Sequence, residues 1–131
     1  MRTHAFRLKP GQDLFDSIQQ FAAVHVIRAG GVLCAVGSLV YATLRLADRD
    51  SFDEYIGPLE IVSLTGTVSI HGSHLHMSMS DGKGKALGGH LVSGCKIHTT
   101  AEIVIADFEE LVFKREFAGD SVYEELAVYP G

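Results

Sequence analysis

Apolar residues recur with a helical spacing in one stretch of the chain, residues 13–28. The apolar positions in this stretch are Leu14, Ile18, Phe21, Ala22 and Val26. Spacings of three and four residues place them on one face of a helix. Gln12 or Asp13 can cap the start of this helix, and Gly30-Gly31 can end it. The pattern therefore predicts one amphipathic helix over residues 13–28.

The other apolar residues lie in short segments that alternate or run together, as in β-strands. These segments are 3–8, 32–36, 39–46, 59–70, 103–105, 111–117 and 126–129. We expect a bend at Gly37-Ser38 and a charged loop over 47–55 that Pro58 closes. Because strands outnumber the single helix, the expected fold class is α+β, with an antiparallel or mixed β-sheet packed against one main amphipathic helix.

Residues 73–98 have the pattern of a β-hairpin, because two alternating segments flank the glycine-rich turn at 81–85. With the bend at the middle of this turn, His76 faces His90, and His74 lies diagonally from His90. The opposite face then carries only apolar side chains, namely Leu75, Met77, Met79, Leu87 and Leu91. A slip of one residue would mix the two faces, so the pattern favours this register.

The polar face of this hairpin carries a candidate metal site. His74 and His76 are two residues apart and point to the same side of a strand, and His90 joins them from the paired strand. Three imidazoles with an open fourth position are the ligand set of catalytic zinc sites. Zinc is the expected metal, although imidazole also suits nickel, copper and iron. The alternative is a solvated polar face without a metal.

The other four of the seven histidines are expected to lie apart from this site. His4 and His25 have the context of surface or helix-flanking residues. His71 falls on the opposite parity of the strand, and His98 lies too far along the chain from His90 to share an ion. The predicted ligands are therefore His74, His76 and His90 alone.

Composition indicates one ordinary globular domain over residues 1–131. The chain is 47% hydrophobic and 21% charged, close to average usage, and its length suits a single core. A net charge of −5 opposes non-specific binding to DNA phosphates. No apolar stretch has the length of a membrane span, and the N-terminus lacks a signal-peptide pattern. We therefore expect a soluble cytoplasmic protein with no membrane partner.

Cys34 and Cys95 form neither a CxxC pair nor a disulfide framework. Both lie in apolar segments, so we expect two buried free thiols, in keeping with a reducing compartment. Glu60 lies inside the apolar run 59–62, which predicts a partly buried carboxylate near the sheet. A salt bridge or hydrogen bond is the first expectation for this residue, and a general base is the catalytic alternative.

Four segments together resemble the PPC domain, the plants and prokaryotes conserved domain. They are residues 35–39, 58–69, 74–81 and 88–94. The resemblance covers nearly the whole chain in order. It implies a compact α+β domain that forms homotrimers, with His74, His76 and His90 clustered as a metal site near subunit contacts. Glu60 matches the acidic position of the family's Glu-Ile-x-Ser-Leu motif.

In plants, this domain follows AT-hook motifs that read the minor groove, and it mediates self-association and contacts with transcription factors. No Arg-Gly-Arg-Pro core of an AT-hook occurs in this sequence, so direct DNA binding is not expected. Three functions stay open. The first is a trimeric metal-binding domain for assembly, ligand sensing or regulation, and the second is a metal-dependent hydrolase or lyase. The third is a DNA-associated regulator that acts through partners, with Lys83, Lys85 and Lys96 as its only clustered basic residues.

Overall fold

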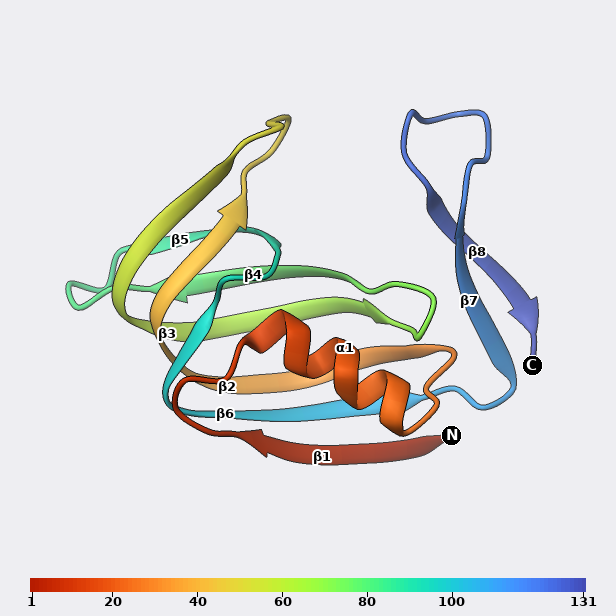
Figure 1. The fold of residues 1–131 in the computed structure, drawn as a ribbon, viewed down its shortest axis with the longest axis horizontal. Helices are drawn as coiled ribbons and strands as arrows, with labels where there is room; N and C mark the ends of the chain where they lie inside the picture. Colours follow the sequence, from red (N-terminus) through yellow and green to blue (C-terminus); the bar gives the residue numbers. More distant parts are fainter.

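The computed structural model of residues 1–131 has one curved sheet, one helix on a face of that sheet, and a two-stranded arm beside it (Figure 1). The elements in chain order are β1 (Arg2–Leu8), α1 (Leu14–Val24), β2 (Gly30–Arg45), β3 (Phe52–Val68), β4 (His74–Ser80), β5 (Ala86–Leu91), β6 (Lys96–Asp107), β7 (Leu111–Glu116) and β8 (Glu125–Pro130). The fold is mostly antiparallel β-sheet with one short helix, which agrees with an α+β class, but the helix is smaller than the main element that was expected.

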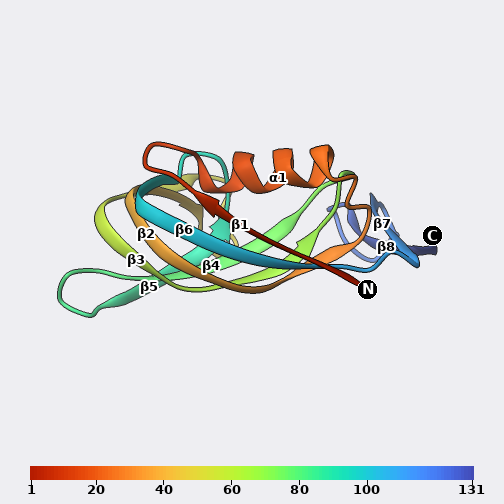
Figure 2. The same ribbon diagram turned by 90° about the horizontal axis from the view of Figure 1, so that it is seen from below.

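The main sheet has six strands in the order β1-β6-β2-β3-β4-β5, and all of its pairings are antiparallel. The end of β2 also pairs with β5, through Leu44 with Leu91 and Arg45 with His90. The sheet therefore curls until β5 meets β2 again, and its curvature is visible from below (Figure 2). This closure brings the end of β2 beside the predicted histidine site.

Helix α1 covers one face of the sheet (Figure 2) and buries one side of its own surface. Its fully buried residues are Leu14, Ile18 and Ala22. Asp13 caps the start, where its carboxylate accepts a hydrogen bond from the Asp16 amide at 2.9 Å. The predicted range of 13–28 was too long, because Val26 adopts a left-handed φ of 52° that ends the helix. With 11 residues, α1 is a small covering element, and no helix is long and apolar enough to span a membrane.

The core between α1 and the sheet is one cluster of 21 buried residues. The inward residues of the β4–β5 hairpin belong to it, namely Leu75, Met77, Met79 and Leu91. Leu87 is half-buried and packs against the same cluster. The predicted core face of the hairpin is therefore confirmed.

Strands β2 and β3 are longer than the sequence pattern predicted. Strand β2 continues through the predicted bend, and β3 begins at Phe52, so the connecting loop is residues 46–51. Pro58 does not close a loop but lies inside β3. The β2–β3 register shifts between Leu39 and Tyr41, opposite this proline. The irregular pairing accommodates a residue that has no amide proton to donate.

The arm, residues 111–130, is a separate two-stranded sheet that stands beside the main one (Figure 1). Hydrogen bonds join the first half of β7 to the body. The Phe113 amide donates to the Arg28 carbonyl at 2.9 Å, and the Ser69 hydroxyl donates to the Phe113 carbonyl at 2.9 Å. Many apolar residues of the arm are exposed, namely Phe117, Val122, Tyr123, Leu126, Val128 and Tyr129.

The two cysteines differ in their environment. Cys95 is buried, as predicted, and burial raises the pKa of its thiol to about 11. Cys34 is exposed, so the expectation of a second buried thiol was wrong. The β2–β6 register shifts between Val32 and Cys34, and this bulge interrupts the alternation of inward and outward side chains.

Candidate metal centre

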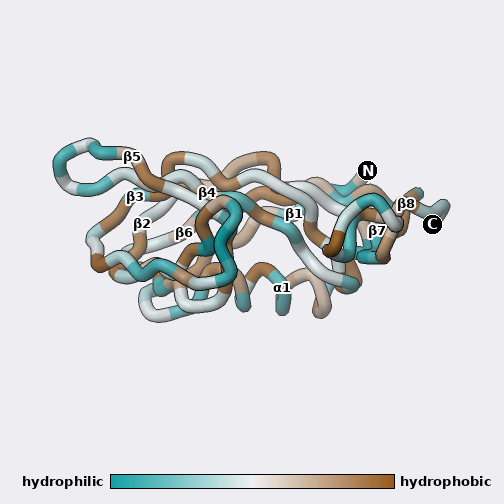
Figure 3. Tube along the Cα trace, turned by 90° about the horizontal axis from the view of Figure 1, so that it is seen from above, coloured by the Kyte–Doolittle hydropathy of each residue, from teal (hydrophilic) through white to brown (hydrophobic).

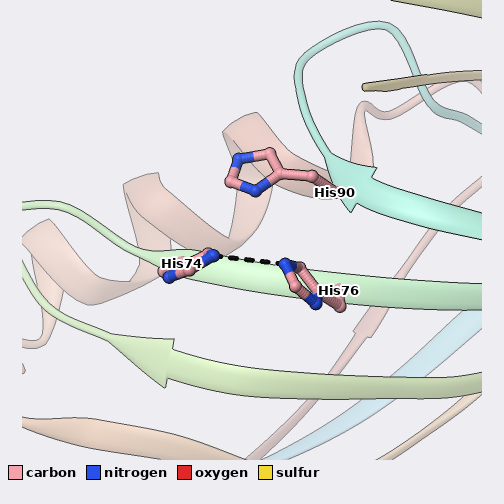
Figure 4. Close-up of side chains that lie close together, drawn as sticks. All are labelled: His74, His76 and His90. Atoms are coloured by element: carbon pink, nitrogen blue, oxygen red, sulfur yellow. Dashed lines mark hydrogen bonds between the residues drawn. The ribbon is translucent and has the colours of Figure 1, made fainter. Parts of the chain in front are cut away.

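The candidate site lies on the outer face of the β4–β5 hairpin, opposite the core. His74 and His76 belong to β4, and His90 belongs to β5 and pairs directly with His76. This pairing confirms the predicted register. Figure 4 shows the three side chains reaching into one shared space from the two strands. The site therefore depends on strand alternation, which sends these rings outward and Leu75 inward.

The three imidazoles lie close enough to share one ion. Nε2 of His74 and Nε2 of His76 are 3.2 Å apart, and one ring nitrogen from each of the three residues lies within 4.8 Å of the others. Tetrahedral zinc with nitrogen at about 2.1 Å places its ligand atoms about 3.4 Å apart. One pair is already near that spacing, and the His90 nitrogen lies within 4.8 Å of both.

One buried ring nitrogen of the cluster lacks a hydrogen-bond partner. Nδ1 of His90 is buried, and no polar atom of the chain pairs with it. Leaving a buried polar atom unpaired costs free energy. A metal ion, or a donor group of a bound molecule, would satisfy this nitrogen. The donor set thus fits a divalent metal that accepts nitrogen ligands.

Electrostatics keeps two of these rings uncharged at neutral pH. Burial lowers the pKa of His90 to about 4, and the positive charge of Arg45 adds to this effect. The residue His74 is largely exposed, but partial desolvation of its ring lowers its pKa as well, with smaller contributions from His76 and Arg115. Metals bind the neutral imidazole. At pH 7, His74 and His90 therefore need not lose a proton before they coordinate an ion.

Three pockets border the histidine cluster. One of about 270 Å³ lies between the cluster and the end of β2, and one of about 180 Å³ lies over Thr65–Thr67 of β3. The third, of about 390 Å³, lies between the cluster and the arm. We call the third the arm pocket; its lining residues are Arg45, Gly72, Ser73, His74, His90, Arg115, Tyr123, Glu124 and Glu125.

Glu60 lies apart from the histidines. Its side chain is exposed, so the expected partial burial was wrong. Glu60 pairs with Ser80, which is four positions along β4 from His76, or about 13 Å at the usual rise of a strand. Glu60 lines none of the three pockets that border the cluster.

The remaining histidines also lie outside the cluster. His71 and His98 are exposed, and His25 caps the end of α1. His4 differs from the predicted surface residue, because its side chain is only 9% exposed and its Nε2 lies 3.2 Å from the Asp107 carboxylate. The pairing of β1 with β6 brings these two residues together.

Sequence reasoning missed three charged residues near the cluster. Arg45 reaches it from the end of β2, and Arg115 and Glu125 reach it from the arm. The alternation of Leu44, Arg45 and Leu46 indicated an outward side chain at position 45. No sequence signal connected the arm to the histidines, because that proximity depends on the path of the chain after β6.

The three lysines considered for nucleic-acid binding do not gather into one basic patch. Lys83 and Lys85 lie in the turn between β4 and β5, a hydrophilic segment of the chain (Figure 3). Their backbone amides both donate to the Asp81 carboxylate at 2.9 Å, so a negative charge lies within the same turn. Lys96 starts a different strand, β6.

This chain is similar to two proteins of known structure and to part of a longer protein. A hypothetical protein from Salmonella enterica is 37% identical with a TM-score of 0.96, covering 98% of this chain and 94% of that one. A metal-containing protein from Archaeoglobus fulgidus is 25% identical with a TM-score of 0.83, covering 97% and 94%. The bifunctional protein GlmU of a Synechococcus strain is 45% identical over 128 residues, or 98% of this chain. The chain spans 21% of the length of that relative.

The model of the Plants and Prokaryotes Conserved (PCC) domain matches residues 1–109. The match includes the three histidines and stops just before the arm. It covers most of the chain and agrees with the resemblance carried by the four sequence segments. The protein therefore belongs to the Plants and Prokaryotes Conserved domain family.

Proposed function

We propose that this protein is a homotrimeric zinc-binding domain with His74, His76 and His90 as ligands, and that it serves assembly or ligand sensing. The observation that carries the proposal is the convergence of three ring nitrogens within 4.8 Å on paired strands. The unpaired Nδ1 of His90 adds to it. The similar structure from Archaeoglobus fulgidus is that of a metal-containing protein, which supports a metal here as well.

Three histidine ligands would leave one zinc coordination position open for an exchangeable ligand. When bound, zinc supplies Lewis acidity at that position. The protein residues around it hold the three rings in place, lower the pKa of His74 and His90, and form the neighbouring pockets. This arrangement suits a site that binds a small molecule reversibly.

The arm supports the proposal of a homotrimer. An isolated two-stranded sheet is only marginally stable in water. This arm also exposes large apolar side chains, among them Val122 at 82% and Phe117 at 69%. Exposed apolar groups of this kind mark interaction surfaces. We infer that neighbouring copies of the chain cover the arm.

Metal analysis of untagged protein tests the metal site. We expect one zinc per chain in calorimetric titration, and loss of binding in His76→Ala and His90→Ala. His98→Ala is the matched control, because His98 is exposed and outside the cluster. Parallel titrations with nickel and copper decide the preferred metal. Wild-type protein that takes up no metal would exclude the proposed site.

Sedimentation equilibrium tests the assembly. We expect a mass three times that of the 14.2 kDa chain, and a shift toward monomer in Val128→Lys, because Val128 is 54% exposed on the arm. Lys85→Glu, in the turn between β4 and β5, is the control and should leave the mass of the assembly unchanged. A wild-type monomer at micromolar concentration would contradict the trimer.

A metal-dependent enzyme is the second candidate, because the arm pocket of about 390 Å³ adjoins the histidines. Glu125 lines that pocket and is better placed than Glu60 to move a proton. Screening of the zinc-loaded protein against hydrolase and lyase substrates tests this candidate, with His76→Ala as the blank. Activity that survives in the blank would exclude a role for the metal.

A further inference from the structure

Two arginines that lack acidic partners border the arm pocket. Arg45 lies at the end of β2, where its backbone pairs with that of His90. Arg115 lies on β7 and donates a hydrogen bond to the Thr67 hydroxyl at 2.7 Å. Neither guanidinium forms a salt bridge, since the ion pair of the chain joins His4 and Asp107, although Glu124 and Glu125 line the same pocket.

Both arginine side chains are half-buried, which restricts them more than free surface residues. A guanidinium presents a planar fork of donors that matches a carboxylate or a phosphate. His74 and His90 line the same pocket, so a molecule between the arginines would also lie beside the metal ligands. The volume of about 390 Å³ falls at the low end of the range for small-molecule sites, about 300–1,000 Å³.

Acidic residues of the arm limit what the pocket can accept. Glu124 and Glu125 line it as well, and their charges repel a polyanion such as nucleic acid. Glu125, Tyr123 and Ser73 also offer polar groups that suit a hydroxyl or ammonium group of a ligand. The lining therefore favours a small anion of low charge.

We propose that the arm pocket binds a small oxyanion, a carboxylate or a phosphate, between Arg45 and Arg115, with one of its oxygens in the open coordination position of the metal. The inference rests on the proposed zinc site and names the class of ligand for it. It also gives the arm a role in ligand binding, because the arm supplies Arg115 and Glu125 as walls of the pocket.

Cobalt-loaded protein provides a direct test, since cobalt(II) substitutes for zinc and its visible absorption reports on its ligands. Metal stoichiometry is measured first. Succinate and inorganic phosphate are then titrated separately, with absorption and calorimetry as readouts. We expect saturable binding of at least one anion together with a change in the cobalt spectrum.

The variants Arg45→Gln and Arg115→Gln should each weaken this binding about tenfold or more, because a charge-assisted hydrogen bond is lost. Arg115→Lys retains the charge without the fork and should fall between wild type and Arg115→Gln. Arg7→Gln removes the same charge from β1, at the opposite edge of the sheet, and should bind like wild type.

The outcomes separate the two proposals. Protein that binds cobalt but neither anion, or arginine variants that bind as tightly as wild type, would overturn the oxyanion site and leave the metal site standing. Protein that binds no cobalt would overturn both. Binding of succinate alone assigns the pocket to carboxylates, and binding of phosphate alone assigns it to phosphates.

Discussion

The two faces of strand β4 differ completely in chemistry although their residues alternate along one backbone. Leu75 and Met77 are 0% and 3% exposed and pack into the core, whereas His74 and His76 between and beside them are exposed. Burial of the inner face fixes the strand, and the fixed strand sets the spacing of the outer rings. Truncation of an inner residue should therefore act first on stability, whereas truncation of an outer histidine should act on metal binding alone.

Truncation of the inner face should have the largest effect. Leu75→Ala removes a fully buried side chain and should lower the free energy of unfolding by about 2–5 kcal/mol, from lost burial and the cavity left behind. Urea denaturation measures the change. Ser78→Ala on the outer face of the same strand is the control and should change stability by about 0.5 kcal/mol or less. Equal losses in both variants would refute the division between the faces.

Truncation of the outer face should affect only the metal-bound protein. Zinc at a hundred times its dissociation constant should stabilise the wild type by about 2.7 kcal/mol, and His76→Ala should lose this gain. Without metal, the variant should unfold within about 0.5 kcal/mol of wild type, because His76 is exposed. Thermal unfolding with and without zinc tests both statements. A large loss in metal-free His76→Ala would mean that the outer face also supports the fold.

A change in strand spacing should affect both faces. A Cβ added at Gly88 would lie 2.3 Å from the Met77 carbonyl oxygen, so Gly88→Ala must push β5 away from β4. We expect a loss of about 1–3 kcal/mol and weaker zinc binding, since His90 follows two residues later. Gly82→Ala in the turn meets no atom within 4 Å and should change neither property. Unaltered zinc affinity in Gly88→Ala would show that the site tolerates strand movement.

Acidification of the metal-free protein should have the smallest effect, because His90 is only partly buried and solvent screens much of the interaction behind its lowered pKa. The pKa of His90 is lowered to about 4, while in the unfolded chain a histidine titrates near 6.5. Between these values the unfolded state binds more protons, so stability should fall as the pH drops from about 6.5 to about 4. Urea denaturation at several pH values measures this slope. It should flatten in His90→Gln and persist in His98→Gln, and an unchanged slope in His90→Gln would exclude the buried imidazole as its cause.

Local patterns predicted the hairpin and its three histidines. The glycine-rich turn at 81–85 and strict alternation on both sides left one register that separates Leu75 from His76. The helix was likewise predicted by its spacing and by Asp13, although its end was not. Val26 is apolar and at helical spacing, and its left-handed backbone depends on the path into β2.

Features that depend on the whole sheet could not be predicted. Glu60 lies in an apolar run that suggested burial. Its outward-facing neighbour on β3, Val62, is 59% exposed, so the outer face of the sheet also carries apolar residues and an apolar run does not mark a buried segment. The bulge between Val32 and Cys34 breaks the alternation of inward and outward side chains in β2, so the exposure of Cys34 could not be predicted from the pattern. Arg45 and Arg115 meet the histidines only through closure of the sheet and the placement of the arm.

All three proposed ligands lie in one hairpin, with a single short turn between His76 and His90. Closing so short a loop costs little chain entropy, whereas the pairing of β2 with β5 joins distant segments and forms slowly. The hairpin alone holds the ligand set, so a bound ion would act on it as a cross-link between two neighbouring strands.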